Sequence, residues 1–467
     1  MRRTVLVGAA LVITGCSTLA PHYSRPPLPV ANKYPEPGLP GPYDATVKTA
    51  WRTYYADPRL RQVIAIALDN NRDLRQAVFR IQETRGEYGI QRADLFPTVD
   101  AGANANLARL PGNSSLVGPL GRLTYGQIGL SVPFWEVDLW GRLRNLKEAA
   151  LQEYLASEEA HRGVAVSLIA DVADTWLMVR ELDERILLAQ RTVDSRAESF
   201  RLSTRRYEVG STSLLDLKQV EVLLRQAEAL VAELQQERAD QAHALTLLAG
   251  TTKPLPFAGE PFNDAGIMEE LRVGLPSELL VDRPDIIAAE HELVAAHANI
   301  GAARAAFFPQ LILTGSGGTA SLELGRLFSS DPLFSGTSAM WNFLPSITVP
   351  IFDAGRNRSN LDLAVARRNG AVARYEKTIQ TAFRDVSNAL SDHRFLAQQL
   401  EVQQANLAAE TERARLATLR YNAGSAPFLD KLDADRDVLS AQQQVVQIRR
   451  ALLSSRVRLY EALGGGA

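Results

Sequence analysis

The sequence predicts a mainly α-helical protein with a small β part, built as two copies of one long-helix plan. The stretch at about 141–208 contains no proline and no turn cluster, and its counterpart at about 355–422 also contains no proline, so each favours one very long helix. Two segments, about 98–135 and about 310–351, alternate apolar and polar residues and indicate β-hairpins. The third observation is duplication, because both long stretches lead into the same sequence motif.

The N-terminus has the features of a secretory signal. Met1-Arg2-Arg3 is positively charged, Val5 to Ile13 is apolar, and small residues precede Cys16, the only cysteine. This ending resembles a bacterial lipobox, so we expect residues 1–15 to be a lipoprotein signal peptide and Cys16 to carry a covalent lipid. The same resemblance implies sorting to the outer membrane, because Ser17 is not aspartate. An ordinary cleaved signal with an incidental cysteine is the alternative.

Residues 16–59 are expected to form a lipid-anchored, proline-rich arm. Eight prolines fall between Pro21 and Pro42, and apolar periodicity is weak, which is typical of an extended tether. After the signal, no apolar run approaches the roughly 20 residues that a membrane-spanning helix needs. The chain is therefore expected to cross a membrane by strands or not at all.

The first copy is expected to occupy residues 60–250. A helical pattern from about Leu60 to Phe96 ends at Pro97, after which the apolar period changes from that of a helix to two. The hairpin at about 98–135 is followed by the long helix at about 141–208, which would be about 100 Å long. A tip at 207–216 and a second helix complete the copy.

The second copy is expected to repeat this order over residues 279–464. It has a helix, a hairpin at about 310–351, a long helix at about 355–422, a tip at 421–433 and a closing helix. Residues 251–278, which include four prolines, are predicted to be the linker between the copies.

The helix after the first tip carries a heptad pattern of apolar residues. Such a pattern predicts antiparallel coiled-coil packing against the long helix before the tip. The apolar residues on the two heptad positions are Leu217, Leu224, Val231 and Leu245, and Val220, Ala227, Leu234 and Leu248.

Each tip is predicted to be a tight turn between two helices. Gly210 and Gly424 stand where a helix can end in a left-handed cap, and a small polar residue follows each of them as an N-cap candidate.

The strands set a requirement for assembly. Four strands of about ten residues fit a tilted outer-membrane barrel, but a small barrel needs about eight. An open sheet would leave backbone groups without hydrogen bonds in lipid. Several chains must therefore share one barrel.

These features together resemble the TolC/OprM-type outer membrane efflux protein family, in its lipoprotein branch. The tip motif Arg-Tyr-x-x-Gly-x-x-x-x-Leu-Asp occurs twice, at 206–216 and at 420–430. The resemblance implies a homotrimer with a 12-stranded β-barrel, four strands per chain, joined to an α-barrel tunnel in the periplasm. It also implies a passive exit duct for small solutes such as drugs. The implied partners are a periplasmic adaptor (membrane fusion) protein and an inner-membrane RND-type transporter, which together open the tip.

The resemblance also implies roles for tip residues. Tyr421, Asp430 and Asp433 match the pore-constriction positions of the family, where three-fold symmetry would turn each acid into a ring. Ala426 stands where some members have a gate arginine, and Arg436, on the same helical face as Asp433, could supply the cation instead. Solvated acids near a helix start are the alternative for Asp430 and Asp433. By the same resemblance, the surfaces at Gly210 and Gly424 meet the adaptor.

Other classes of function find little support. A net charge of -2 does not indicate binding to nucleic acid. The sequence shows neither a nucleophile paired with a general base nor a cluster of metal ligands, so it does not indicate an enzyme or a further cofactor. Two alternatives remain open at this point, a channel for type I protein secretion and a lipid-tethered periplasmic coiled-coil scaffold.

Overall fold

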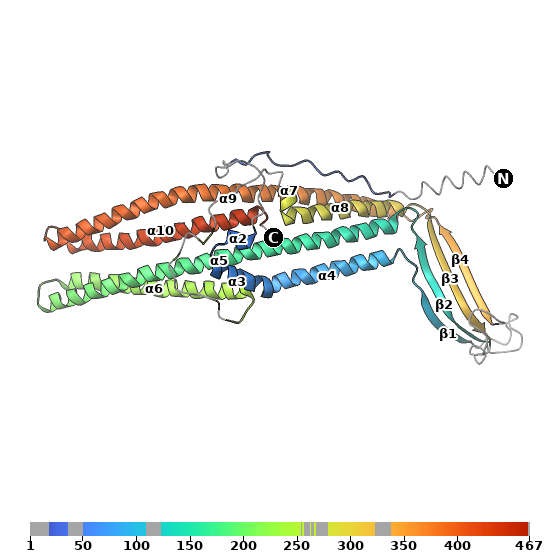
Figure 1. Ribbon diagram of the computed structural model, residues 1–467, viewed down its shortest axis with the longest axis horizontal. Coiled ribbons are helices and arrows are strands. Elements are labelled where there is room, and N and C mark those ends of the chain that lie inside the picture. Colours follow the sequence, from blue (N-terminus) through green and yellow to red (C-terminus); the bar gives the residue numbers. More distant parts are fainter. Residues whose placement is uncertain are drawn as a thin grey trace. The chain divides into compact units, whose positions relative to one another are not determined.

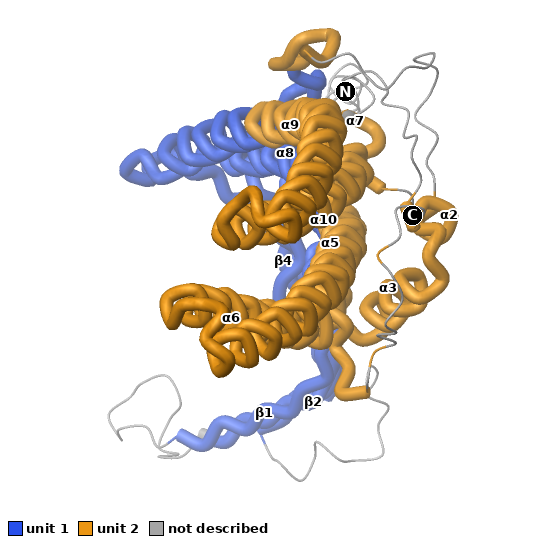
Figure 2. Tube along the Cα trace, turned by 90° about the vertical axis from the view of Figure 1, so that its left-hand side faces the viewer, with its two compact units in different colours: residues 1–26, 81–157, 289–375 blue, residues 27–80, 158–288, 376–467 orange. Residues whose placement is uncertain are grey.

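The computed structural model describes residues 18–35, 50–108, 123–253, 255, 262, 266–267, 279–322 and 338–465. The predicted signal peptide and Cys16 lie outside these residues, as does most of the predicted linker. The chain divides into two compact units, coloured in Figure 2, and each unit draws on both sequence copies. One comprises residues 1–26, 81–157 and 289–375, and the other comprises 27–80, 158–288 and 376–467. None of the described helices combines the length and the apolar character needed to cross a membrane.

Long helices dominate both copies (Figure 1). The helices are α2 (Trp51–Tyr54), α3 (Pro58–Asn70), α4 (Arg72–Ala93), α5 (Arg142–Glu208), α6 (Leu214–Ala249), α7 (Leu279–Asp282), α8 (Pro284–Ala305), α9 (Arg356–Asn422) and α10 (Phe428–Ala462). The strands are β1 (Asp100–Ala108), β2 (Leu123–Val137), β3 (Gln310–Ser321) and β4 (Ala339–Thr348). The helices α5 and α9 each contain 67 residues.

The expected single helix from Leu60 to Phe96 is wrong, because the chain breaks at Asn71. Asn71 follows the end of α3 with ψ of 137°, and its side-chain oxygen accepts hydrogen bonds from the backbone N–H groups of Asp73 and Leu74, both at 2.9 Å. Asparagine competes in this way with helical hydrogen bonding and caps the helix that follows it. Its amide also donates to the Leu248 carbonyl at 2.9 Å, which ties the break to the end of α6.

The four strands form one antiparallel sheet in the order β1-β2-β3-β4 (Figure 1). Ala101 pairs with Leu130, which in turn pairs with Gly317, so the apolar positions of the two hairpins share one face. Asn104 and Gln127 pair on the other face. The alternation in the sequence therefore predicted the two faces of the sheet correctly as far as Val132. It was wrong at Phe134, because a register shift follows Val132 and Trp135 lies opposite Leu313 instead.

The expected strand pattern ran too far at its C-terminal end. It extended to Ile351, whereas β4 ends at Thr348. Pro350 has no N–H group to donate to a neighbouring strand, which explains the early end.

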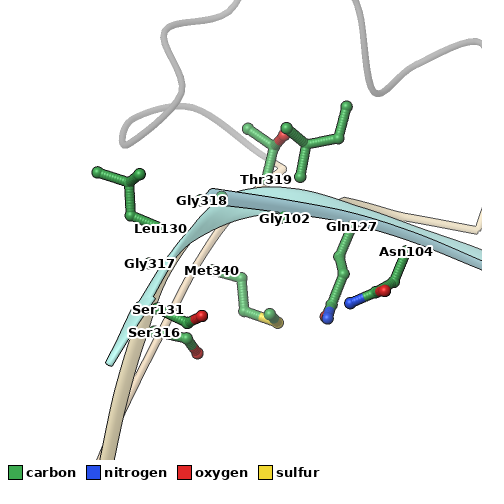
Figure 3. A pocket seen from close by; sticks show the side chains of 12 residues that line it. Gly102, Asn104, Gln127, Leu130, Ser131, Ser316, Gly317, Gly318, Thr319 and Met340 are labelled. Atoms are coloured by element: carbon green, nitrogen blue, oxygen red, sulfur yellow. The ribbon is translucent and has the colours of Figure 1, made fainter. Parts of the chain in front are cut away.

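The central strands approach each other closely where Gly129 pairs with Gly318. A Cβ atom at Gly129 would lie 2.3 Å from the Gly317 carbonyl oxygen, and one at Gly318 would lie 2.1 Å from the Ile128 carbonyl oxygen. Only glycine fits at either position. Figure 3 shows this region, with the side chains of Leu130 and Thr319 on one side of the sheet and those of Asn104, Gln127, Ser131, Ser316 and Met340 on the other.

The heptad pattern of α6 marks its buried face. All but one of the predicted seam residues are buried, and Leu248 is half-buried. Val231 and Leu234 pack in one cluster with Leu182 and Ala189 of α5. This is the antiparallel coiled-coil contact that the spacing predicts.

A buried group of charges joins α5 to α10. Glu181 is only 2% exposed, and it accepts hydrogen bonds from Arg185 at 3.2 Å and from Arg450 of α10 at 2.8 Å. The Nε of Arg185 also donates to the side-chain oxygen of Gln443 at 2.7 Å. A carboxylate can be buried in this way because it is paired on both sides.

Candidate functional site

The two tips share the same turn geometry. Gly210 has φ of 75° and Gly424 has φ of 71°, both in the left-handed region predicted for them. The N–H of Ser211 bonds to the Arg206 carbonyl at 2.8 Å, and that of Ser425 bonds to the Arg420 carbonyl at 3.0 Å. Each long helix therefore ends in a Schellman-type cap, which closes the turn between the two helices.

The helices after the two tips begin differently. Ser213 forms a capping box with Asp216 at the start of α6. The expected polar N-cap of the second tip is wrong, because Pro427 occupies that position and makes no side-chain bond. The hydroxyl of Ser425 instead donates to the Arg420 carbonyl at 3.0 Å, so proline supplies the start of α10 through its fixed backbone angle.

Tyr421 links the two tips. Its hydroxyl accepts a 2.8 Å hydrogen bond from Arg206, in the last turn of α5, and its ring lies 4.9 Å from that of Phe428, the first residue of α10. Sequence reasoning missed Arg206 as the partner of Tyr421. The signal was present, because Arg206-Tyr207 and Arg420-Tyr421 are the duplicated start of the tip motif.

The acids expected at the constriction lie on the first two turns of α10. Asp430 is exposed in the first turn, and Asp433 pairs with Arg436 at 3.3 Å. Arg436 also donates to Asp437 at 3.3 Å, and Asp437 accepts a 2.9 Å hydrogen bond from Arg413 of α9. Arg436 therefore lies between two carboxylates, and one of them is tied to the neighbouring helix.

The pKa of Asp437, the carboxylate that binds both Arg436 and Arg413, is shifted from its usual value. The hydrogen bond from Arg413 lowers the pKa of Asp437, and Arg436 adds to the shift. Positive neighbours favour the charged form of a carboxyl group. The link between α9 and α10 at the tip is therefore an ionic one at neutral pH.

The tip surfaces are open and partly apolar. A Cβ atom at Gly210 or Gly424 would have no other atom within 4 Å apart from those of its chain neighbours. Val209 is 78% exposed and Leu215 is 68% exposed, so two aliphatic side chains beside the first tip lie in solvent. These residues present a surface on which a second protein could pack.

Known proteins resemble this chain over nearly its whole length. The family model described as "Outer membrane efflux protein" matches residues 63–251 and 275–465. The probable efflux pump outer membrane protein TtgC of Pseudomonas putida is 40% identical over 465 residues, which cover 99% of this chain and 95% of TtgC. A crystal structure of a membrane protein from Pseudomonas aeruginosa matches with a TM-score of 0.90 at 38% identity, covering 96% of this chain and 100% of that chain. The open state of the Neisseria gonorrhoeae MtrE outer membrane channel matches with a TM-score of 0.86 at 37% identity, covering 96% and 98%.

The fold and these similarities agree with the class of protein expected from the sequence. The family consists of outer membrane efflux proteins, which are not enzymes. Its model covers both sequence copies, including both tips and both pairs of strands. The chain therefore belongs to the outer membrane efflux protein family.

Proposed function

We propose that this chain forms, as a homotrimer, the outer membrane duct of a tripartite efflux pump. The main observation in support of this proposal is the four-stranded sheet. Its edge strands β1 and β4 have no further strand beside them among the described residues, and its apolar face includes Trp341, which is 81% exposed. A sheet in lipid must have its backbone groups paired, so copies of the chain have to supply the missing neighbours. Three copies would contribute twelve strands to one closed wall.

The lipid anchor is the second part of the proposal. A lipid on Cys16 would hold the chain at the outer membrane beside its own strands. The lipobox-like sequence before Cys16 supports this assignment.

The tips are proposed as the periplasmic gate. In a trimer, Tyr421, Asp430 and Asp433 of three chains would face a common axis, and rings of like charge attract cations and repel one another. Some family members have a gate arginine at the position of Ala426. In this chain Arg436, which pairs with Asp433, would supply that positive charge instead. The open surfaces at Gly210 and Gly424, with Val209 and Leu215 exposed beside the first of them, suit contact with a periplasmic adaptor. An RND-type inner-membrane transporter would deliver small solutes to the duct.

Channel recordings test this function. The purified protein should migrate on a gel as a trimer that heating dissociates. Reconstituted in planar bilayers, it should show a small single-channel conductance, because the closed tips limit the current. A monomer in detergent that never forms a conducting species would overturn the proposal.

A further inference from the structure

The C-terminal end of α10 lies against acidic side chains from other helices. Glu461, in the last turn of α10, accepts a hydrogen bond from the Ser167 hydroxyl of α5. Four other titratable groups interact electrostatically with it, namely Asp171 of α5, Arg283 just before α8, Asp385 of α9 and Tyr55 just after α2. All of these residues belong to one compact unit. The end of α10 is therefore a place where several acids meet.

Arg283 is the cation that acts on Glu461, but its hydrogen bonds go to other groups. Its guanidinium donates to both carboxylate oxygens of Asp285, at 3.0 and 2.7 Å, and lies 3.7 Å from Asp385. It also donates to the Ala462 carbonyl at 3.0 Å, which holds the last residue of α10. Among the described residues, no ion pair joins Arg283 to Glu461. The negative charge of Glu461 is thus only partly balanced.

The residues after Glu461 pack closely against neighbouring helices. Gly464 has φ of 94°, and a Cβ atom on it would lie 2.7 Å from the carbonyl oxygen of Asp282, the last residue of α7. A Cβ atom on Gly465 would lie 3.0 Å from both methyl carbons of Val166 in α5. The position of the α10 end is therefore coupled to α5 and α7.

The surroundings of Glu461 favour its neutral form. Burial raises the pKa of Glu461 above its ordinary value, and the hydrogen bond from Ser167 opposes this rise. Asp171 and Asp385 raise the pKa further, whereas Arg283 lowers it. An acid whose pKa is raised by folding stabilises the fold below its unfolded pKa of about 4.3, and this contribution is lost as the pH rises through the folded pKa. Mild acidification should therefore tighten the end of α10.

We propose that Glu461 and the acids around it form a pH-sensitive joint, which holds the end of α10 more firmly on α5 and α9 when the surroundings become mildly acidic. Proton uptake removes the repulsion of Glu461 by Asp171 and Asp385 and leaves the hydrogen bonds of Arg283 in place. Because α10 begins beside the second tip, the joint fixes the end of the helix that is remote from that tip. Only an influence on opening of the duct rests on the proposed function.

Hydrogen exchange followed by mass spectrometry tests the joint in the full-length protein in detergent. Protection factors, which correct for the intrinsic effect of pH on exchange, are compared for residues 452–463 at about pH 5 and about pH 7.5. We expect wild-type protection to be about fivefold greater at the lower pH. Glu461→Gln should show the same high protection at both pH values, because the neutral amide keeps an acceptor for Ser167. Glu401→Gln is the matched control, an exposed glutamate of α9 that should leave the wild-type response unchanged.

Asp171→Asn separates an electrostatic role from a purely structural one. Asp171 is exposed, and removing its charge should increase the protection of residues 452–463 at neutral pH and reduce the response to acid. Reduced protection in this variant would overturn the joint, as would equal wild-type protection at both pH values or an undiminished response in Glu461→Gln. The measurement needs no channel activity. A protein that fails to conduct would thus refute the proposed function, while hydrogen exchange alone decides on the joint.

Discussion

Arg206 and Tyr421 join the ends of the two long helices through a 2.8 Å hydrogen bond. Arg206 belongs to the first sequence copy and Tyr421 to the second, so the bond ties the two tips of one chain together. The corresponding residues, Tyr207 and Arg420, make no such bond to each other among the described residues. The duplicated motif is therefore used asymmetrically, and one arginine–tyrosine pair carries the link.

Removing the tyrosine hydroxyl should loosen the proposed gate. Tyr421→Phe deletes the acceptor of Arg206 and keeps the ring that packs on Phe428. A hydrogen bond to a charged group is worth about 1.5–3 kcal/mol at most, and less when exposed. We expect a roughly fivefold larger open fraction in planar-bilayer recordings. Tyr207→Phe, in the first tip, is the control and should leave the currents unchanged. Equal currents from wild type and Tyr421→Phe would remove this bond from the gate.

The carboxylate of Asp433 should control the response of the channel to cations. Asp433→Ala removes one proposed ring of charge and the 3.3 Å partner of Arg436. We expect larger currents and weaker block by divalent cations, because fewer charges bind the ion. Gln219 occupies the matching position of the first copy, so Gln219→Ala is the control. Unchanged block in Asp433→Ala would exclude Asp433 from the constriction.

Patterns within one helix or strand were readable from the sequence, whereas contacts between distant segments were not. The heptad at Leu217 and Leu224 marks a buried face, because spacing along a helix reports directly on which side packs. The break at Asn71 was missed because the apolar period continues across it, and only the hydrogen bonds reveal the cap. The partner of Tyr421 lies 215 residues away in sequence, so the residues around Tyr421 do not identify it, and only the duplication of Arg206-Tyr207 as Arg420-Tyr421 points to it.

Acidification should weaken the link between α9 and α10 only at low pH. Asp437 has a pKa lowered by Arg413 and Arg436. A carboxyl group whose folded pKa is depressed stabilises the fold above its unfolded value of about 4 and loses this contribution as the pH falls through the folded pKa. The link should therefore persist from neutral pH to about pH 4 and fail below it. The side-chain NMR signal of Asp437 would report the titration, and Arg413→Gln should move it upward. A midpoint above that of a free aspartate would contradict the pairing.

Breaking the buried charge group should destabilise the protein strongly. Glu181→Ala leaves Arg185 and Arg450 in a buried site without their shared carboxylate. Removing one partner of a buried ion pair costs about 3–5 kcal/mol. Glu184→Ala is the control, because its 3.3 Å pair with Arg449 is more exposed and should contribute about 1 kcal/mol or less. Thermal unfolding followed by circular dichroism in detergent compares the two, and equal losses would show that Glu181 is not an anchor of α5 to α10.

The paired glycines of the sheet should be essential for strand formation. Gly318→Ala would place a methyl group 2.1 Å from the Ile128 carbonyl oxygen, and Gly129→Ala would place one 2.3 Å from the Gly317 carbonyl oxygen. Neither backbone can move aside without breaking the pairing of β2 with β3, so we expect both variants to lose most of the protein from the outer membrane fraction. Gly102→Ala, on β1, is the control because a Cβ there has no atom within 4 Å. Quantitative immunoblots of separated membranes measure the outcome. Normal levels of folded protein in Gly318→Ala would show that the two central strands can separate at this point without loss of the sheet.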